Sequence, residues 1–164
     1  MRWKPYLATG AATTAAVVVG GMGTSLDTPW YADLERPSWQ PPGEVIGLVW
    51  AGLYASIAGA TGRAAARARP ADRRRIGALL GVNLAINAAW PWVFFRAHRP
   101  ALGVAVIGAL EASTIALARE VARTDRAAAA ALAPYLAWNL FAMTLNATIA
   151  AKNAASRPDR GGVR

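Results

Sequence analysis

Five long apolar stretches, separated by polar segments, dominate the hydrophobic pattern of this 164-residue chain. Each is close to the roughly 20 residues that an α-helix needs to cross a hydrocarbon core ~30 Å thick. None shows the two-residue alternation of a barrel strand, and lipid offers the backbone no hydrogen bonds. The pattern predicts an all-α integral membrane protein, a bundle of five transmembrane helices forming one domain over residues 1–156. We place these helices at about residues 5–26, 43–63, 76–96, 100–119 and 129–151.

One connection is much longer than the others. Residues 27–42 read DTPWYADLERPSWQPP, and their four prolines prevent a continuous helix. The segment also carries Trp30, Tyr31 and Trp39. Aromatic residues at a membrane interface often form a belt, but the stiff prolines favour a fixed lid across the helix ends. Residues 157–164 are expected to be a disordered basic tail.

Charge supports the membrane interpretation. Only 16% of residues are charged, 55% are hydrophobic, and the arginines cluster between the apolar stretches. The net charge of +9 suits helix ends anchored among lipid headgroups, and no nucleic-acid motif accompanies it. The N-terminus, 63–75 and 119–126 together hold more Lys and Arg than the opposite side, so the positive-inside rule predicts that they are cytoplasmic. We expect a multi-pass protein of the cell membrane.

Some chemistry is excluded by composition. The chain has no cysteine, and its single histidine, His98, lies in a short basic stretch where we expect a solvated loop. Disulfides and thiolate metal sites are therefore impossible, and we predict no metal site. The run from Tyr6 to Leu26 is longer than the apolar core of a signal peptide, so we interpret it as a spanning helix.

The third stretch has two faces with different chemistry. At about 100° per residue, Asn83, Asn87, Trp90 and Phe94 share one narrow face. Asparagine facing lipid would leave its amide unsatisfied, so this face points inward, either to a cavity or only to neighbouring helices. Small residues at four-residue spacing form a ridge on the opposite face, where another helix can pack, in the same subunit or in a homodimer. The ridge is Gly77, Gly81, Ala85 and Ala89.

Two other stretches add aromatic faces. The second carries Trp50 and Tyr54, and the fifth carries Trp138 and Ala142. Both tryptophans lie deeper than a belt position, so three helices offer mixed aromatic and amide faces. Such a pocket suits a large, flat, mostly apolar ligand with a few polar groups. Glu111, in the middle of the fourth stretch, is either functional or, as we favour, neutral or paired with an interior polar group.

Four groups of residues, in order along the chain, carry a family resemblance. They are Trp30-Tyr31, Leu34, Arg36-Pro37-Ser38-Trp39 and Pro41-Pro42; Val49-Trp50 and Leu53-Tyr54; Asn87, Trp90-Pro91 and Phe94-Phe95; and Pro134-Tyr135 with Trp138. Between about Trp30 and Asn146, the chain resembles the translocator protein family, also called the tryptophan-rich sensory protein or peripheral benzodiazepine receptor family. The resemblance implies a five-helix bundle, usually a homodimer, with a pocket near the first long loop.

The resemblance also implies a ligand class. Members bind porphyrins such as protoporphyrin IX, and tryptophans matching Trp50 and Trp138 are linked in some bacterial members to light-dependent porphyrin breakdown. The helix-five cholesterol motif of animal members lacks its aromatic residue here, so cholesterol binding is not expected. Family analogy places the N-terminus on the non-cytoplasmic side, against the charge rule. The implied ligand-binding residues are Tyr31, Trp39, Trp50, Tyr54, Asn87, Trp90, Pro91, Trp138 and Ala142.

Three functions are weighed. The leading one is tetrapyrrole binding, as sensor, scavenger or carrier, with porphyrin as ligand and no required cofactor. The second is an enzyme that degrades porphyrin in light through Trp50 and Trp138, since we find no Ser-His-Asp set, inward carboxylate pair or metal cluster. The third is a small porphyrin or metabolite transporter, for which Glu111 is the only support.

Overall fold

The computed structural model describes residues 3–155, whose regular structure is helical with no strand; the tail predicted at 157–164 lies outside these residues. Five of its helical spans are long and apolar enough to cross a membrane, as predicted. A short helix, α2, lies in the long loop, and the third span ends in a π-helical segment, η1. The elements are α1 (Lys4–Gly23), α2 (Pro29–Ala32), α3 (Gly43–Arg67), α4 (Pro70–Pro91), η1 (Trp92–Arg96), α5 (Pro100–Thr124), α6 (Arg126–Ala130) and α7 (Ala133–Ala155).

Several helix ends differ from the expected ones. The first helix ends at Gly23 rather than near 26, whereas others extend further than expected at the basic end. The third helix begins at Pro70 rather than near 76, and α3 and α5 continue to Arg67 and Thr124. The expectation followed the apolar residues alone, whereas a helix continues into the headgroup region, where arginine side chains are solvated. At the other end of the third span, Pro91 closes α4 and the backbone bonding changes to the wider π pattern.

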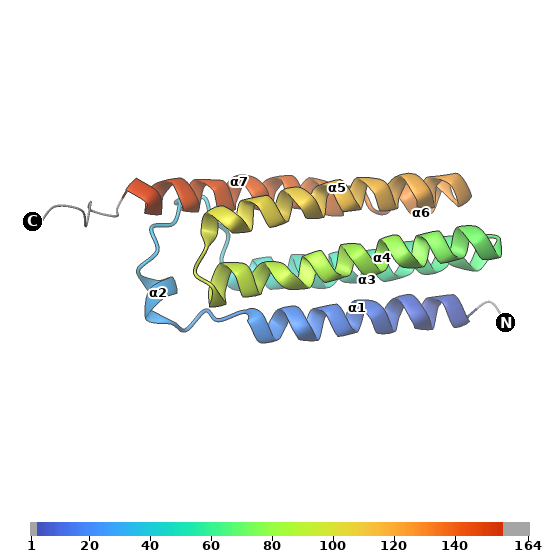
Figure 1. Cartoon of the computed structure of the whole chain (residues 1–164), viewed down its shortest axis with the longest axis horizontal. Coiled ribbons are helices and arrows are strands. Elements are labelled where there is room, and N and C mark those ends of the chain that lie inside the picture. The colour runs from blue at the N-terminus through green and yellow to red at the C-terminus, as the bar shows by residue number, and fades with distance from the viewer. Residues whose placement is uncertain (1–2, 156–164) are drawn as a thin grey trace, which may run out of the picture.

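The long helices run side by side along the long axis of the molecule, with α2 crossing one end (Figure 1). Helix α1 packs against α3 and α4, α4 packs against α5, and α5 packs against α7. Helix α3 meets α7 at few positions. Close approach of α1 to α3 needs Gly62, because a Cβ there would lie 2.8 Å from the Tyr6 ring. The Thr9 hydroxyl donates to the Ala58 carbonyl at 2.9 Å and ties the same pair together.

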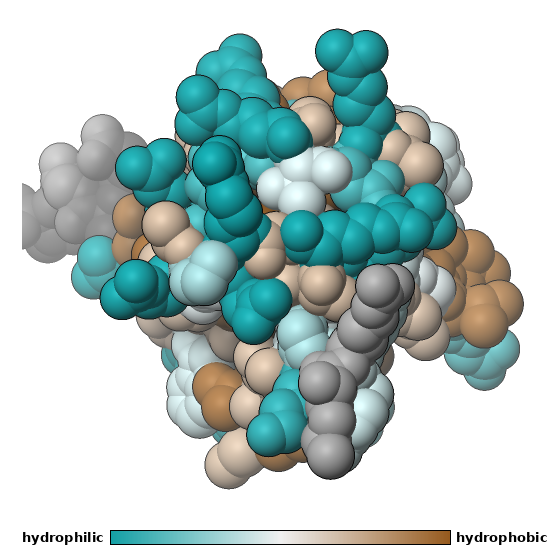
Figure 2. Space-filling model, turned by 90° about the vertical axis from the view of Figure 1, so that its right-hand side faces the viewer, coloured by the Kyte–Doolittle hydropathy of each residue, from teal (hydrophilic) through white to brown (hydrophobic). Residues whose placement is uncertain are grey.

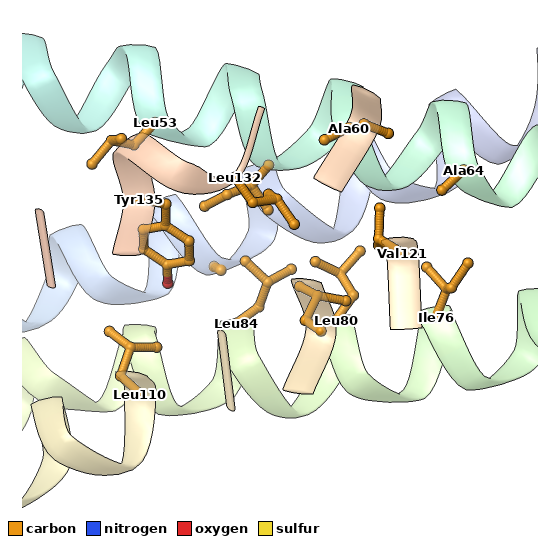
Figure 3. Packing of buried hydrophobic residues seen from close by; sticks show 14 of the residues in the cluster. Leu53, Ala60, Ala64, Ile76, Leu80, Leu84, Leu110, Val121, Leu132 and Tyr135 are labelled. Atoms are coloured by element: carbon orange, nitrogen blue, oxygen red, sulfur yellow. The ribbon is translucent and has the colours of Figure 1, made fainter. Parts of the chain in front are cut away.

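The apolar core fills the half of the bundle away from α2. Ile57, Leu117, Val121, Leu132 and Tyr135 are completely buried there, and Figure 3 shows several of them meeting between the helices. Lipid tails are as apolar as these side chains, so dispersion and hydrogen bonds between helices hold the bundle together. The tight half therefore acts as a rigid base for the looser half beside α2.

The fifth span is broken between α6 and α7. Asp125 starts α6 by accepting a hydrogen bond from the Ala128 N–H at 3.0 Å. Pro134 lies just after the break and cannot donate to the preceding turn. The Ser56 hydroxyl of α3 donates to the Ala131 carbonyl at 2.6 Å, so the carbonyl left over at the break is satisfied from a neighbouring helix.

The two ends of the bundle differ strongly in charge. The start of α1, the α3–α4 connection and the α5–α6 connection share one end, which Figure 2 shows covered by hydrophilic side chains. Within residues 3–155 this end holds ten lysines and arginines against three acidic residues, and the end at α2 holds four of each. The ten are Lys4, Arg63, Arg67, Arg69, Arg73, Arg74, Arg75, Arg119, Arg123 and Arg126.

Candidate functional site

A cavity of about 380 Å³ opens in the half of the bundle beside α2, where α3 and α7 separate. Its volume falls in the range of small-molecule sites, about 300–1,000 Å³. Every long helix contributes to its wall, and the loop between α1 and α3 closes one end. It is lined by Val17, Gly20, Gly21, Thr24, Leu26, Tyr31, Gln40, Gly43, Ile46, Gly47, Trp50, Tyr54, Asn87, Trp90, Pro91, Phe94, Phe95, Ile107, Leu110, Trp138, Asn139, Phe141, Ala142, Leu145, Asn146 and Ile149.

Eight of the nine residues expected to bind ligand line this cavity. They are Tyr31, Trp50, Tyr54, Asn87, Trp90, Pro91, Trp138 and Ala142. The ninth, Trp39, lies outside the lining with 46% of its surface exposed. Its ring packs against Phe141, a lining residue, with ring centroids 5.8 Å apart. Trp39 therefore supports the wall from behind.

Two tryptophans meet edge to face in the wall of the cavity. The ring centroids of Trp50 on α3 and Trp138 on α7 are 6.5 Å apart, and their planes are nearly perpendicular at 87°. Tyr54 lies one turn after Trp50, with its ring 5.3 Å away. This arrangement joins the aromatic rings of α3 and α7 into one continuous part of the wall, on which a flat ligand can stack.

Asn87 is held in a chain of buried hydrogen bonds. The Tyr54 hydroxyl donates to Asn87 Oδ1 at 2.7 Å, and Asn87 Nδ2 donates to the Tyr135 hydroxyl at 3.0 Å. The Tyr135 hydroxyl donates to Asn83 Oδ1 at 3.1 Å, and Asn83 Nδ2 donates to Thr114 at 2.8 Å. Both ends of the Asn87 amide are thus engaged within the protein. Asn87 positions the Tyr54 ring in the wall, while Asn83 only joins helices.

A second buried amide fixes Trp90. The Trp90 indole N–H donates to Asn146 Oδ1 at 2.8 Å, and Asn146 Nδ2 donates to the Pro100 carbonyl at 2.7 Å. Gly103 makes room for this amide, because a Cβ there would lie 2.7 Å from Asn146 Oδ1. The indole plane of Trp90 is stacked on Phe94, with ring centroids 5.1 Å apart.

The 27–42 segment folds as a lid. Trp30 and Tyr31 pack their rings on Phe94 and Phe95 at 5.7 and 5.4 Å, and Leu34 is buried with them. Trp30 also stacks on His98 at 4.3 Å, so His98 is a packed residue of a turn, although exposed, and not simply a solvated loop residue.

The lid is fastened to the end of α7 by one side chain. The Glu35 N–H donates to Asn153 Oδ1 at 3.1 Å, and Asn153 Nδ2 donates to the Glu35 carbonyl at 3.0 Å. These two bonds join residues 118 positions apart in sequence. We name this pair of hydrogen bonds the Glu35–Asn153 latch.

The polar groups of the cavity wall are uncharged. No lysine, arginine, aspartate or glutamate is among the lining residues. Three buried lining atoms have no hydrogen-bond partner: Gln40 Oε1, Trp138 Nε1 and Asn139 Oδ1. A ligand with an apolar body and a few hydrogen-bonding groups suits such a wall.

Periodicity missed several lining residues. Gln40 belongs to a loop without regular spacing, and it donates to the Tyr31 hydroxyl at 3.3 Å. Phe141 packs beside Trp138, with ring centroids 5.0 Å apart, and its ring lies between the cavity and Trp39. Helix α1 contributes only Val17, Gly20 and Gly21, which carry no signal of a site.

Two further expectations concern surfaces away from the cavity. The ridge residues Gly77, Gly81, Ala85 and Ala89 are all exposed, so helices of the same subunit do not use this face. Glu111 Oε2 is buried in α5 without a hydrogen-bond partner. Its carboxyl is not among the groups that line the cavity.

Comparison with known proteins agrees with this architecture. The family model described as the TspO/MBR family matches residues 10–151. The chain is 38% identical over 130 residues to the human translocator protein, across 71% of this chain and 70% of that protein. It is 30% identical over 146 residues to the tryptophan-rich sensory protein of Cereibacter sphaeroides, across 89% of each. It is 29% identical over 130 residues to the protein CrtK of Rhodobacter capsulatus, across 79% of this chain and 81% of that protein.

Proposed function

This chain belongs to the TspO/MBR family of membrane proteins, and from that premise we propose that it binds a tetrapyrrole such as protoporphyrin IX in the cavity between α3 and α7. The main support for this proposal is the composition of the cavity wall. The ring planes of Trp50 and Trp138 are nearly perpendicular, with ring centroids 6.5 Å apart, and the polar groups around them are uncharged. A macrocycle stacks on one ring and meets the edge of the other. The bound porphyrin makes the protein a sensor, scavenger or carrier in the cell membrane.

The carboxylates of a porphyrin need a place outside this uncharged wall. Arg36 lies on the lid with its guanidinium 4.9 Å from the centre of the Tyr31 ring, and Tyr31 lines the cavity. Arginine binds carboxylates through two parallel hydrogen bonds. A propionate reaching the lid would therefore pair with Arg36, while the ring system stays among the tryptophans.

Titration in the dark tests the proposal. Protoporphyrin IX added to the purified protein should quench tryptophan fluorescence in a saturable way. Trp138→Ala removes one stacking surface and should weaken binding by about tenfold or more. Asn87→Ala, which frees the Tyr54 ring, should also weaken it. Unchanged affinity in both variants would place the ligand elsewhere.

A second candidate is light-dependent porphyrin degradation. It is favoured by the same pair of indoles, because both would contact one excited macrocycle at short range. The test is the loss of porphyrin absorbance under illumination, in wild type and in a Trp50→Phe, Trp138→Phe double variant. Phenylalanine keeps an aromatic face but removes the oxidisable indole. Loss at the same rate in both would exclude chemistry through these two tryptophans.

A further inference from the structure

A second hollow lies toward the basic end of the bundle, and none of its lining residues belongs to the cavity between α3 and α7. It has a volume of about 290 Å³ and lies between α3 and the α6 region. We name it the α3–α6 cleft; its lining is Ser56, Gly59, Ala60, Arg63, Ala127, Ala128 and Ala131. A Cβ built on Gly59 would have no atom within 4 Å, so the space beside this glycine is open.

The cleft runs inward from the headgroup level. Arg63 lies one turn before the end of α3, and Ser56 lies seven residues further into the membrane, which is roughly 10 Å along a helix. The hydrocarbon part of the wall is formed by glycine and alanine, whose small side chains leave the hollow open. A hollow facing lipid fills with acyl chain, because an empty one would forfeit dispersion contacts along its whole lining.

Arg63 is held in place at the outer end of the cleft. Its Nε lies 2.8 Å from Asp125 Oδ2, and Arg67 also pairs with this carboxylate. Asp125 is buried, whereas the Arg63 side chain is 46% exposed. One carboxylate cannot neutralise two guanidinium groups, and the pairing through Nε leaves the terminal nitrogens of Arg63 available. A guanidinium fixed in this way loses little side-chain freedom when it binds an anion.

We propose that the α3–α6 cleft is a binding site for one anionic phospholipid, with an acyl chain along Gly59 and Ala131 and the headgroup phosphate on Arg63. The positive charge of the basic end of the bundle favours a lipid with an anionic headgroup. It carries ten basic residues against three acidic ones within residues 3–155, so a lipid with a net negative headgroup is preferred to a zwitterionic one of the same chain length.

Native mass spectrometry of the purified full-length protein tests this site. The probes are phosphatidylglycerol and phosphatidylcholine with identical acyl chains. We expect one phosphatidylglycerol per chain to bind about fivefold or more tightly than phosphatidylcholine. Gly59→Leu, which fills the cleft, should abolish this preference. Gly52→Leu is the matched control, because Gly52 is also exposed on α3 with nothing within 4 Å of a built Cβ, but lines no hollow.

A second set of variants tests the role of the Arg63 charge in headgroup preference. Arg63→Ala should remove the preference for phosphatidylglycerol, while Arg67 still holds Asp125. Arg69→Ala is the control, since Arg69 is an exposed arginine of the same end that does not line the cleft. If Gly59→Leu does not fold, Ala131→Leu fills the cleft from the opposite wall.

The proposal is overturned if wild type binds the two lipids equally, or if Gly59→Leu and Ala131→Leu both retain the preference. A change of oligomeric mass in the cleft variants without any change in lipid binding would also overturn it, because the cleft would then be a contact between copies of the chain. None of these outcomes depends on porphyrin binding, so this proposal and the proposed function fail separately.

Discussion

The Tyr54 hydroxyl donates to Asn87 Oδ1 at 2.7 Å, and this bond connects the wall of the cavity between α3 and α7 with the buried core of the bundle. Asn87 passes the connection on to Tyr135, which is completely buried between the helices. We therefore expect Asn87 to affect both ligand binding and the stability of the bundle. Asn83 belongs to the same chain of hydrogen bonds but lines no cavity, so we expect it to affect stability alone.

This difference predicts distinct outcomes for two similar substitutions. Asn87→Ala and Asn83→Ala should each lower the stability in detergent by about 1–2 kcal/mol, because each removes hydrogen bonds between helices. Asn87→Ala leaves the Tyr54 hydroxyl without its acceptor, and Asn83→Ala removes the acceptor of the buried Tyr135 hydroxyl. Only Asn87→Ala should also weaken porphyrin binding. Thermal unfolding and a dark fluorescence titration of both variants measure the two effects. Equal loss of affinity in the two would show that Asn87 acts only through the fold.

The Glu35–Asn153 latch predicts an effect on the rate of ligand exchange. Asn153→Ala removes the two hydrogen bonds of the latch, which are together worth on the order of 1 kcal/mol at an exposed position. Porphyrin should dissociate about fivefold faster, as measured by stopped-flow fluorescence. Thr144→Ala is the control, because this exposed hydroxyl bonds only within its own helix. Identical dissociation rates in both variants would mean that the lid does not control release.

The exposed ridge on α4 predicts a homodimer contact. Gly77, Gly81, Ala85 and Ala89 face away from every helix of their own subunit, and small residues at this spacing let two helices pack closely. Gly81→Leu should therefore reduce cross-linked dimer in detergent without lowering the unfolding temperature. Gly52→Leu, an equally exposed glycine on α3, should leave the dimer intact. A dimer that survives Gly81→Leu would exclude this face as its interface.

The charge difference between the two ends predicts the membrane orientation. The basic end should be cytoplasmic, which places the end of α7 and the lid on the opposite side. Alkaline phosphatase fused at the C-terminus should be active, and a green fluorescent protein fusion there should be dark. The reverse pattern would show that family analogy, and not the arginine count, gives the orientation.

Much of the cavity was predictable because helical periodicity alone aligns its residues. Trp50 and Tyr54 share a face of one span, Asn87 and Trp90 share a face of another, and both faces line the cavity. The hydrogen-bond partners of these residues on other helices could not be predicted from periodicity. The pairing of Asn87 with Tyr135 depends on how two helices are rotated against each other, and no spacing within one helix contains that information.

The remaining differences also have physical causes. Trp39 shares the loop with Tyr31, but its ring packs against Phe141 from outside the cavity, and sequence does not show that direction. The predicted ends of α3 and α5 fall short of the observed ones because the apolar pattern stops at the first arginine. The helices in fact continue beyond the hydrocarbon, where arginine is solvated.

If porphyrin occupies the cavity between α3 and α7, a bulky side chain that fills this cavity should weaken porphyrin binding. Ala142 lines the cavity, and Ala137 is exposed on the same helix outside it. The decisive measurement is the dissociation constant of protoporphyrin IX in the dark for Ala142→Trp against Ala137→Trp. We predict that Ala142→Trp raises it by about tenfold or more, while Ala137→Trp leaves it at the wild-type value. Wild-type affinity in a folded Ala142→Trp protein would contradict the account.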